Sequence, residues 1–395
     1  MVREIAISIY LFIFRLFFYT FRLFPQKEKT TFVTSFGDNI FYVLKEVEKQ
    51  TNDQMIILQT PQCKFNFDII DSHHKILNFG TYHFIDWFRS IYHLATSKKV
   101  FVDNYYGFLA VTDFKPNVTC IQLWHAAGAI KQFGLKDPSN KLRSQRANQR
   151  FQKVYSRFNY VVVGSEKMAN IFRESFNLSN DQILRSGIPR TDLFFNPENL
   201  KQLETELKLK YPIINNKKVI LYAPTFRDGE LNNSSIKLNI ESMYQELKED
   251  YVLFLRLHPA MNVTFNNKYP DFIIDVSNYV NINELLVITD ILITDYSSIP
   301  FEFSLLNRPI LFYAYDLEEY SQSRGFWEDY EHMVPGPVLK TTDELIYKIQ
   351  NNEFDLDLIS SFAKLWNQYS LGYSSKRLVE LIYSDDEALE AVDHG

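Results

Sequence analysis

The chain has 395 residues, of which 46% are hydrophobic and 16% aromatic, so it is globular and long enough for two domains. Its formal net charge of −6 excludes a global basic field that would attract nucleic acid. The two cysteines do not make a disulfide framework, and no Cys/His cluster has the spacing of a structural zinc site.

The first 25 residues contain an apolar segment that ends at Pro25. Its longest run, residues 5–14, is too short to predict a membrane-spanning helix, and no small-residue cleavage site of a signal peptide follows it. Arg15 and Arg22 are seven residues apart and therefore share a helix face. This pattern predicts a helix that lies in the membrane interface with its arginines at the lipid headgroups. The alternative is a first helix packed into the protein.

From residue 26 onward, short apolar runs alternate with amphipathic helical patterns. The runs are residues 31–36, 55–58, 99–102, 119–123 and 160–163, and then 218–222, 251–255, 272–274, 291–293 and 309–313. Continuous apolar runs between helices predict parallel sheets with helices on both faces. The expected fold class is therefore α/β, with two doubly wound, Rossmann-like domains that face each other across a cleft.

A polar segment at residues 196–216 marks the expected linker. We expect a membrane-associating amphipathic helix at 1–25, a first domain at 26–200, a second domain at 201–380 and a loose acidic tail at 381–395. Ligands of doubly wound sheets bind outside the carboxyl ends of the strands. Polar residues that directly follow the apolar runs are therefore the candidate site.

A histidine follows the run 119–123, within the sequence Trp124-His125-Ala126-Ala127-Gly128. The small residues beside it leave room for a ligand, and the ordinary pKa of histidine suits a general base. His125 is therefore a candidate base. The alternative is a histidine whose hydrogen bonds are satisfied by the local backbone.

Hydroxyl, guanidinium and imidazole groups follow two strands of the second domain, a pattern typical of an anion site. Thr225 and Arg227 come after the run 218–222 and can hold phosphate oxygens, unless Arg227 only pairs with Asp228 in a turn. Arg256 and His258 alternate after the run 251–255 and therefore share a face.

The strand at residues 290–294 turns directly into a helical pattern through Ser297 and Ser298. This turn places hydroxyls and free N–H groups at a helix N-terminus, where a phosphate binds well. The alternative is that Ser297 is only an N-cap and Glu302 a first-turn acid. Arg190, in the segment 187–192, is a weaker candidate for the same anion.

Five basic residues recur at steps of three and four along one segment. They are Arg143, Arg146, Arg150, Lys153 and Arg157. On a helix they fall on one face, and no acidic residue between Asp137 and Glu166 neutralises them. We expect this face to bind anionic headgroups or a lipid-linked pyrophosphate, and a solvated face is the alternative.

These motifs together resemble the CDP-glycerol glycerophosphotransferases of wall teichoic acid synthesis. The resemblance covers roughly residues 35–366 and is carried by the segments 122–125 (QLWH), 187–190 (GIPR), 220–228 (ILYAPTFRD), 257–259 (LHP), 290–298 (DILITDYSS) and 312–326. Polymerases of this family generally have His-Gly-Thr-Pro where this chain has His125-Ala126-Ala127-Gly128. With the compact length and the apolar N-terminus, that departure makes the chain most similar to the primases, which add the first glycerol phosphate.

The resemblance implies a two-domain GT-B fold with no cofactor and no catalytic metal. It implies CDP-glycerol as the donor, bound by the second domain. The implied acceptor, bound by the first domain, is an undecaprenyl-diphosphate-linked disaccharide of N-acetylmannosamine and N-acetylglucosamine. A sugar hydroxyl would attack the β-phosphorus and release CMP. The protein would work as a peripheral protein at the cytoplasmic face of the cell membrane.

The resemblance also implies roles for single residues. His125 and His258 are the catalytic pair, and one of them is the base. Glu302 contacts the ribose hydroxyls, and the diphosphate is held by Arg190, Thr225, Arg227, Ser297 and Ser298. Three other functions stay open: a polyglycerol or ribitol phosphate polymerase, a nucleotide-sugar glycosyltransferase of GT-B fold, and a noncatalytic membrane scaffold.

Overall fold

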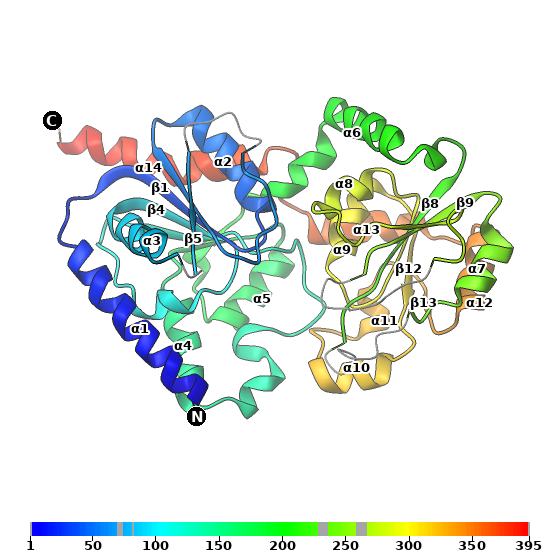
Figure 1. Cartoon of the computed structure of the whole chain (residues 1–395), viewed down its shortest axis with the longest axis horizontal. Helices are drawn as coiled ribbons and strands as arrows, with labels where there is room; N and C mark the ends of the chain where they lie inside the picture. The colour runs from blue at the N-terminus through cyan, green and yellow to red at the C-terminus, as the bar shows by residue number, and fades with distance from the viewer. Residues whose placement is uncertain (1, 69–73, 81–82, 228–235, 258–266, 394–395) are drawn as a thin grey trace. The chain divides into compact units, whose positions relative to one another are not determined.

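The computed structural model describes residues 2–68, 74–80, 83–227, 236–257 and 267–393 (Figure 1). The chain divides into two compact units. Unit 1 consists of Met1–His125, Phe133–Asp192 and Tyr369–Gly395, and unit 2 of Ala126–Gln132 and Leu193–Gln368. These units differ from the ranges expected from sequence, because the C-terminal segment contacts unit 1 and a short segment after His125 contacts unit 2.

Unit 1 is built on a seven-stranded sheet with the order β3-β2-β1-β4-β5-β6-β7, in which neighbouring strands are parallel. The strands are β1 (Lys27–Thr34), β2 (Gln54–Gln59), β3 (Lys75–Asn78), β4 (Ser97–Val102), β5 (Thr119–Gln122), β6 (Tyr160–Val162) and β7 (Ile183–Leu184). Helices cover both faces of the sheet, so the last six residues of β1 are buried although four of them, Lys29, Thr30, Thr31 and Thr34, are polar. Phe32 of β1, for example, pairs in register with Phe101 of β4, and their rings stack 5.3 Å apart.

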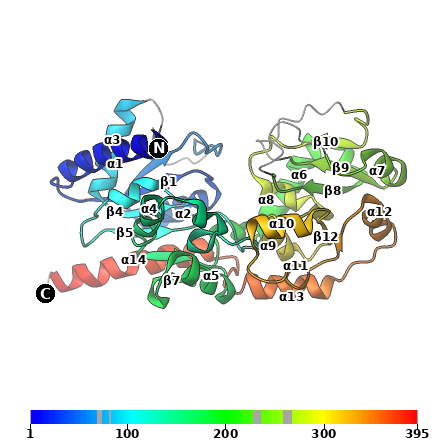
Figure 2. The same ribbon diagram turned by 90° about the horizontal axis from the view of Figure 1, so that it is seen from below.

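The helices of unit 1 lie on both faces of this sheet. They are α1 (Val2–Phe21), α2 (Asp38–Gln50), α3 (Phe84–Thr96), α4 (Gln145–Tyr155), α5 (Glu166–Phe176) and α14 (Ser374–Asp393). Figure 2 shows α1 and α3 on one face and α5 and α14 on the other. The segment 381–393, expected to be loose, is the end of α14.

Unit 2 repeats the same topology with six parallel strands in the order β10-β9-β8-β11-β12-β13. The strands are β8 (Lys218–Ala223), β9 (Tyr251–Leu255), β10 (Ile273–Asp275), β11 (Ile291–Thr294), β12 (Ile310–Tyr313) and β13 (Val338–Leu339). The helices are α6 (Pro197–Lys210), α7 (Ile240–Leu247), α8 (Ile282–Val287), α9 (Ile299–Phe303), α10 (Leu317–Arg324), α11 (Tyr330–Met333), α12 (Thr342–Gln350) and α13 (Leu356–Trp366).

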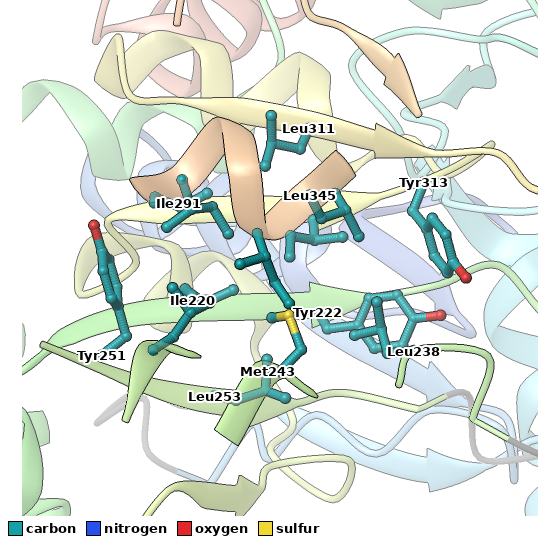
Figure 3. Packing of buried hydrophobic residues seen from close by; sticks show 14 of the residues in the cluster. Ile220, Tyr222, Leu238, Met243, Tyr251, Leu253, Ile291, Leu311, Tyr313 and Leu345 are labelled. Carbon is teal, nitrogen blue, oxygen red and sulfur yellow. The ribbon is translucent and has the colours of Figure 1, made fainter. Parts of the chain in front are cut away.

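One hydrophobic cluster joins the sheet of unit 2 to helices α7 and α12 (Figure 3). Ile220, Leu253 and Ile291 come from three neighbouring strands, and Met243 and Leu345 come from the two helices. All five side chains are almost completely buried. Burial of such side chains is the main favourable term that fixes the sheet and therefore the loops at its ends.

The predicted fold class is confirmed, since both units are parallel α/β sheets with Rossmann-like strand order. In this order the winding direction reverses between β1 and β4 in unit 1 and between β8 and β11 in unit 2. Ligands of such sheets bind at the carboxyl ends of the strands on either side of the reversal. The loops after these strands are therefore where site residues are expected in each unit.

Helix α1 packs on unit 1 through one face. Leu11, Phe14 and Phe18 are buried, and Phe14 contacts the rings of Trp87 and Phe108 at 6.0 and 5.2 Å between centroids. The other face is exposed and apolar, with Ile5, Ile9, Phe12, Ile13 and Leu16. In the part of the chain that the structure describes, α1 is the one helix long and apolar enough to cross a membrane, a criterion that buried helices and signal sequences also meet.

The C-terminal segment is fixed to unit 1 through the motif at residues 187–192. The carboxylate of Asp192 accepts hydrogen bonds from the N–H groups of Ser374 and Ser375 at 2.8 and 2.9 Å, so it caps the start of α14. Gly187, with φ of 88°, lies so close to Ser370 and Ser374 that a Cβ there would overlap with both. This glycine and this aspartate therefore anchor the end of the chain.

Candidate active site

His125 lies at the end of β5 and its ring is held between two aromatic rings. Phe36 stacks on the imidazole at 4.1 Å and Trp124 at 4.3 Å between centroids. Trp124 has a positive φ of 57°, which is uncommon for a bulky residue and turns the chain sharply before the histidine. A backbone conformation of this kind is a local strain that the surrounding packing maintains.

A single hydrogen bond sets the tautomer of His125. Its Nδ1 lies 3.0 Å from the carbonyl oxygen of Asp103. Because a carbonyl can only accept, Nδ1 carries the proton and the neutral ring has its lone pair on Nε2. Burial lowers the pKa of His125 to about 4; the nearby Arg190 also lowers it, while the Asp103 carbonyl and Asp38 act in the opposite direction. The ring is therefore neutral at pH 7 and able to accept a proton.

Arg190 is buried in unit 1 and already has a counter-ion. Its Nη1 lies 2.6 Å from the carboxylate of Asp38, at the start of α2. Its backbone N–H donates to Oδ1 of Asn39, whose Nδ2 donates to the carbonyl of Trp124. Asn39 therefore ties the Arg190 segment to the His125 turn, and the sequence had singled out neither Asp38 nor Asn39.

Asp103 fills the anion-binding position at the first strand-to-helix turn of unit 1. Its carboxylate accepts hydrogen bonds from the N–H groups of Ser35, Phe36 and Gly37, at 2.9–3.2 Å, and from the hydroxyls of Thr34 and Tyr106. In dinucleotide-binding proteins the N–H groups of this turn bind phosphate. Here they donate to the carboxylate of Asp103 instead of a ligand. They therefore fix the residue whose backbone carbonyl orients His125.

Arg227 of unit 2 bridges the loops that follow β11 and β12. Its Nη2 lies 2.9 Å from the carboxylate of Asp295 and its Nε 2.7 Å from that of Asp316. The guanidinium also lies over the rings of Tyr296 and Tyr320, at 5.0 and 4.7 Å from their centroids. Burial opposes the charge, but the hydrogen bond to Asp316 and the charge of Asp295 raise the pKa of Arg227 overall. Arg227 thus pairs with two carboxylates that come from other loops.

Asp295 joins the carboxyl ends of β8 and β11. Its Oδ1 accepts hydrogen bonds from the N–H of Thr225 at 2.7 Å and from the N–H of Tyr296 at 2.6 Å. Because the carboxylate is buried, desolvation raises its pKa, while Arg227 and Thr225 lower it. Thr225, Arg227 and the Ser297 turn are therefore brought together, as expected from their positions after neighbouring strands.

The serine turn begins a helix that is only five residues long. The hydroxyl of Ser297 lies 2.8 Å from that of Thr294 and accepts from the N–H of Ile299 at 3.3 Å. Ser298 is the N-cap residue of α9 and its side chain makes no capping hydrogen bond. Ser297 therefore has the local capping contact of the alternative interpretation, and Ser298 does not.

Glu302 is buried, and its Oε1 accepts a hydrogen bond from the N–H of Ala127 at 3.1 Å. A Cβ on Gly128 would overlap with the ring of Phe301. The small residues after His125 therefore allow this segment to pack closely on α9. That they also leave room for a ligand stays a prediction.

The five basic residues at 143–157 do not share one helix, because α4 begins at Gln145 and ends at Tyr155. Three of them pair with carboxylates from other segments: Arg143 with Asp137, Arg150 with Glu4 and Arg157 with Asp113. The premise that no acidic residue neutralises these five basic residues is therefore wrong, because α1 and two loops contribute carboxylate partners. Arg146 and Lys153 are exposed on α4.

Three further positions complete the candidate set. His258 lies outside the described residues, as does Asp228. Arg15 and Arg22 of the N-terminal segment both lie over the ring of Tyr19, at 5.4 and 5.9 Å. Within the described ranges, no group of three or more His, Cys, Asp or Glu side chains has the arrangement of a metal site.

Comparisons with known proteins agree with these motifs. The sequence model of the family described as CDP-glycerol:poly(glycerophosphate) glycerophosphotransferase matches residues 16–384. The teichoic acid glycerol-phosphate primase of Bacillus subtilis (strain 168) is 39% identical over 386 residues, which cover 96% of this chain and 98% of that protein.

Polymerases are also similar. The teichoic acid poly(ribitol-phosphate) polymerase of Bacillus spizizenii (strain ATCC 23059 / NRRL B-14472 / W23) is 36% identical over 307 residues, which cover 76% of this chain and 49% of that protein. Among solved structures, a variant of the wall teichoic acid polymerase TagF soaked with CDPG has a TM-score of 0.80 and 25% identity, over 98% of this chain and 99% of that chain.

Proposed function

The chain belongs to the family of CDP-glycerol:poly(glycerophosphate) glycerophosphotransferases, and from that premise we propose that it is a teichoic acid glycerol-phosphate primase. One observation carries the choice of primase. The match to the Bacillus subtilis primase covers 96% of this chain and 98% of that protein, whereas the matches to two ribitol-phosphate polymerases cover 49% and 66% of those proteins. In the proposed reaction, glycerol phosphate passes from CDP-glycerol to N-acetylmannosaminyl-N-acetylglucosaminyl-diphospho-undecaprenol.

We propose that His125 is the general base. Its Nε2 accepts the proton of a sugar hydroxyl on the acceptor, and the hydroxyl oxygen attacks the β-phosphorus of CDP-glycerol. The bond between this phosphorus and the bridging oxygen breaks, and CMP leaves with that oxygen. The hydrogen bond from Nδ1 to the Asp103 carbonyl supports this role, because it holds the ring in the tautomer that has a free Nε2. His258 is the second catalytic residue of the proposal.

Unit 2 is the proposed donor-binding domain. Thr225, Ser297 and Ser298 hold the diphosphate of CDP-glycerol through hydroxyl and N–H groups, and Arg227 adds positive charge. The pairing of Arg227 with Asp295 and Asp316 gives it a further task, which is to keep the donor loops in one arrangement.

We propose that two further residues, each of which has a partner in the structure, also bind CDP-glycerol. Arg190 of unit 1 contributes a second guanidinium to the diphosphate, and its ion pair with Asp38 orients it. Glu302 contacts the ribose hydroxyls in addition to its hydrogen bond with the N–H of Ala127. Arg190 lies in the family motif at residues 187–190, and the role of Glu302 rests on its position one helical turn after the serine turn.

We also propose that the protein binds peripherally to the cytoplasmic face of the membrane through α1. The support is the exposed apolar face of this helix and the arginines near its C-terminal end. An acceptor with an undecaprenyl tail resides in the membrane, so an enzyme that uses it must work at that surface.

The donor test uses purified full-length protein with a soluble-tailed analogue of the lipid-linked disaccharide. CDP-glycerol, CDP-ribitol and UDP-N-acetylglucosamine are supplied separately, and nucleotide release is measured. We expect CMP release from CDP-glycerol, at a rate at least about tenfold above that from CDP-ribitol. Transfer from the UDP-sugar would identify a glycosyltransferase instead, and no nucleotide release from any donor would favour a noncatalytic scaffold.

A further inference from the structure

Unit 1 contains a cavity of about 860 Å³ that the family motifs do not include. It lies between α1, α4 and the 3-10 helix η1 (Gly107–Val111). Ile7 and Leu11 line it from α1, and Ala147 and Arg150 line it from α4. This volume is typical of a site for a small organic ligand.

The charged residues of the cavity wall favour an anion. Among the described residues that line it, three are arginines, Arg3, Arg143 and Arg150, and one is acidic, Glu4. Glu4 occupies the guanidinium of Arg150 with two contacts, from Nη1 and Nη2, at 3.2 and 3.3 Å. Arginine forms the same two-contact geometry with a phosphate. The guanidinium of Arg150 can therefore bind a phosphate in the position that the Glu4 carboxylate occupies.

The remaining wall is largely apolar and aromatic. Phe79, Phe108 and Phe151 line it together with the α1 residues. Phe151 stacks on Tyr105 at 4.5 Å, and the guanidinium of Arg143 lies over Phe151 at 4.4 Å from the ring centroid. A ligand that matches this wall has an anionic group and a hydrocarbon chain next to each other.

Two residues that line the cavity are sequence neighbours of residues that contact the candidate base. Ser35 and Asn104 line the cavity. Ser35 directly precedes Phe36, whose ring stacks on His125, and Asn104 directly follows Asp103, whose carbonyl binds His125. The outer wall is α1, whose other face is exposed and apolar. The cavity wall therefore includes the helix proposed to lie on the membrane and the residues next to Phe36 and Asp103, which hold the proposed base.

We propose that this cavity binds the diphosphate and the first isoprene units of the lipid-linked acceptor, with Arg150 as the main diphosphate ligand. The proposal rests on the proposed function, because it assigns the acceptor of that reaction to a place in unit 1. The diphosphate displaces Glu4 from Arg150, and the prenyl chain contacts the aromatic wall before it leaves along α1. The disaccharide then extends past Ser35 and Asn104 toward His125.

The test measures binding without CDP-glycerol, so it does not depend on the transfer reaction. Full-length protein is titrated calorimetrically with farnesyl diphosphate, farnesyl phosphate, farnesol and inorganic pyrophosphate. The variants are Arg150→Gln, Glu4→Gln and, as a matched control, Lys141→Gln, which removes an exposed charge that does not line the cavity. The Tm of each variant is measured to verify folding.

Farnesyl diphosphate is expected to bind at least about tenfold more tightly than each of the other three probes. Arg150→Gln should weaken its binding by about tenfold or more, Glu4→Gln should strengthen it, and Lys141→Gln should leave it unchanged. Weaker binding in both Arg150→Gln and Glu4→Gln would mean that the ion pair is only structural. Equal affinity for pyrophosphate would mean an anion site without a lipid role, and either result overturns the proposal.

A kinetic measurement separates this proposal from the proposed function. If the wild-type protein transfers glycerol phosphate, Arg150→Gln should raise the KM for the acceptor and leave the KM for CDP-glycerol unchanged. An unchanged acceptor KM would reject the cavity and leave the primase assignment intact. Absence of transfer in the wild type, with farnesyl diphosphate binding and its loss in Arg150→Gln, would reject the primase assignment and leave the cavity intact.

Discussion

Three candidate functional side chains, those of His125, Arg190 and Arg227, are each held by a partner from a different segment of the chain. The ring of His125 is oriented by the Asp103 carbonyl, Arg190 by Asp38, and Arg227 by Asp295 and Asp316. Catalysis of phosphoryl transfer depends on positioning and on charges that are already in place. These partners therefore matter as much for the proposed reaction as the side chains that contact the substrate.

The pKa of His125 leads to a prediction about pH. A base must be unprotonated, and burial lowers the pKa of this ring from 6.5 to about 4. Activity should therefore persist as the pH falls through 6.5, and kcat/KM should decline only below about pH 5. Asp38→Asn removes a carboxylate that raises this pKa, so the acid limb should move to lower pH. An acid limb with a midpoint near 6.5 in the wild type would contradict the assignment.

Substitution of the base gives a matched comparison. His125→Gln should lower kcat by about 10²- to 10⁴-fold while the Tm and the affinity for CDP-glycerol stay close to those of the wild type. His332→Gln is the control, since the side chain of His332 is 90% exposed on α11 and should not affect turnover. Near-normal turnover in His125→Gln would show that the base is another group.

Arg227 should affect both stability and donor binding. Arg227→Gln leaves the buried Asp295 without its counter-ion, which should lower the free energy of unfolding by about 3 kcal/mol. Arg227→Lys keeps the charge but cannot make the forked contact, so it should have a smaller effect of the same sign. Denaturant unfolding and the KM for CDP-glycerol measure the two effects. A stable Arg227→Gln variant with an unchanged KM would mean that the bridge has neither role.

In these residue pairs, the sequence analysis predicted the candidate site residue but did not predict the residue that holds it. Thr225, Arg227 and Ser297 were found because each follows an apolar run, and the end of a run can be recognised locally. Asp38 is 152 residues from Arg190 and Asp103 is 22 residues from His125, and an isolated aspartate has no pattern of its own. His125 was found with the right neighbours, but the small residues after it pack on α9, a contact that only the fold reveals.

At the scale of the elements, each strand of the described residues except β3, β7 and β13 overlaps an apolar run predicted from the sequence. The runs at 55–58, 99–102, 218–222 and 251–255 correspond to β2, β4, β8 and β9. Strands β7 and β13 have two residues each, and β3 has a lysine and an asparagine at its ends. A strand of this length gains its order from its neighbour in the sheet and has no independent hydrophobic pattern.

The prediction that the five basic residues at 143–157 lie on one helix was wrong, again because a local pattern does not show the fold. Helical spacing was assumed for residues 143–157, but Ser144 caps α4, so Arg143 lies before the helix and Arg157 after it. Glu4, which neutralises Arg150, is 146 residues away in the sequence. Charge balance in a folded protein depends on such distant pairs, and a local count of acids does not include them.

Helix α1 should bind membranes through its exposed face. The triple variant Ile9→Ser, Phe12→Ser and Leu16→Ser removes apolar surface there and leaves the packed residues Phe14 and Phe18 in place. Binding to anionic vesicles, measured by flotation, should fall by about tenfold or more, with the Tm unchanged. Leu209→Ser is the control, because Leu209 is also an exposed apolar residue but lies on α6. Vesicle binding equal to that of the wild type would exclude α1 as the anchor.

For the whole molecule, the sequence predicted two Rossmann-like domains correctly. It did not predict that the chain returns to unit 1 after Gln368, where α14 packs on α2 and is capped by Asp192. The helical pattern of α14 is compatible with either unit. Its place depends on the hydrogen bonds of Ser370, Ser374 and Ser375 to the segment 187–192, which is remote in sequence.

The distinction between a primase and a polymerase concerns the whole molecule, because both kinds of enzyme in this family have the same fold and transfer the same kind of group. They differ in how many units they add. Full-length protein, an excess of CDP-glycerol and the soluble-tailed disaccharide acceptor should be incubated to completion, and the products weighed by mass spectrometry. We expect the acceptor to gain the mass of one glycerol phosphate, with one CMP released per acceptor. A ladder of products with several added units would contradict the assignment and make this chain a polymerase.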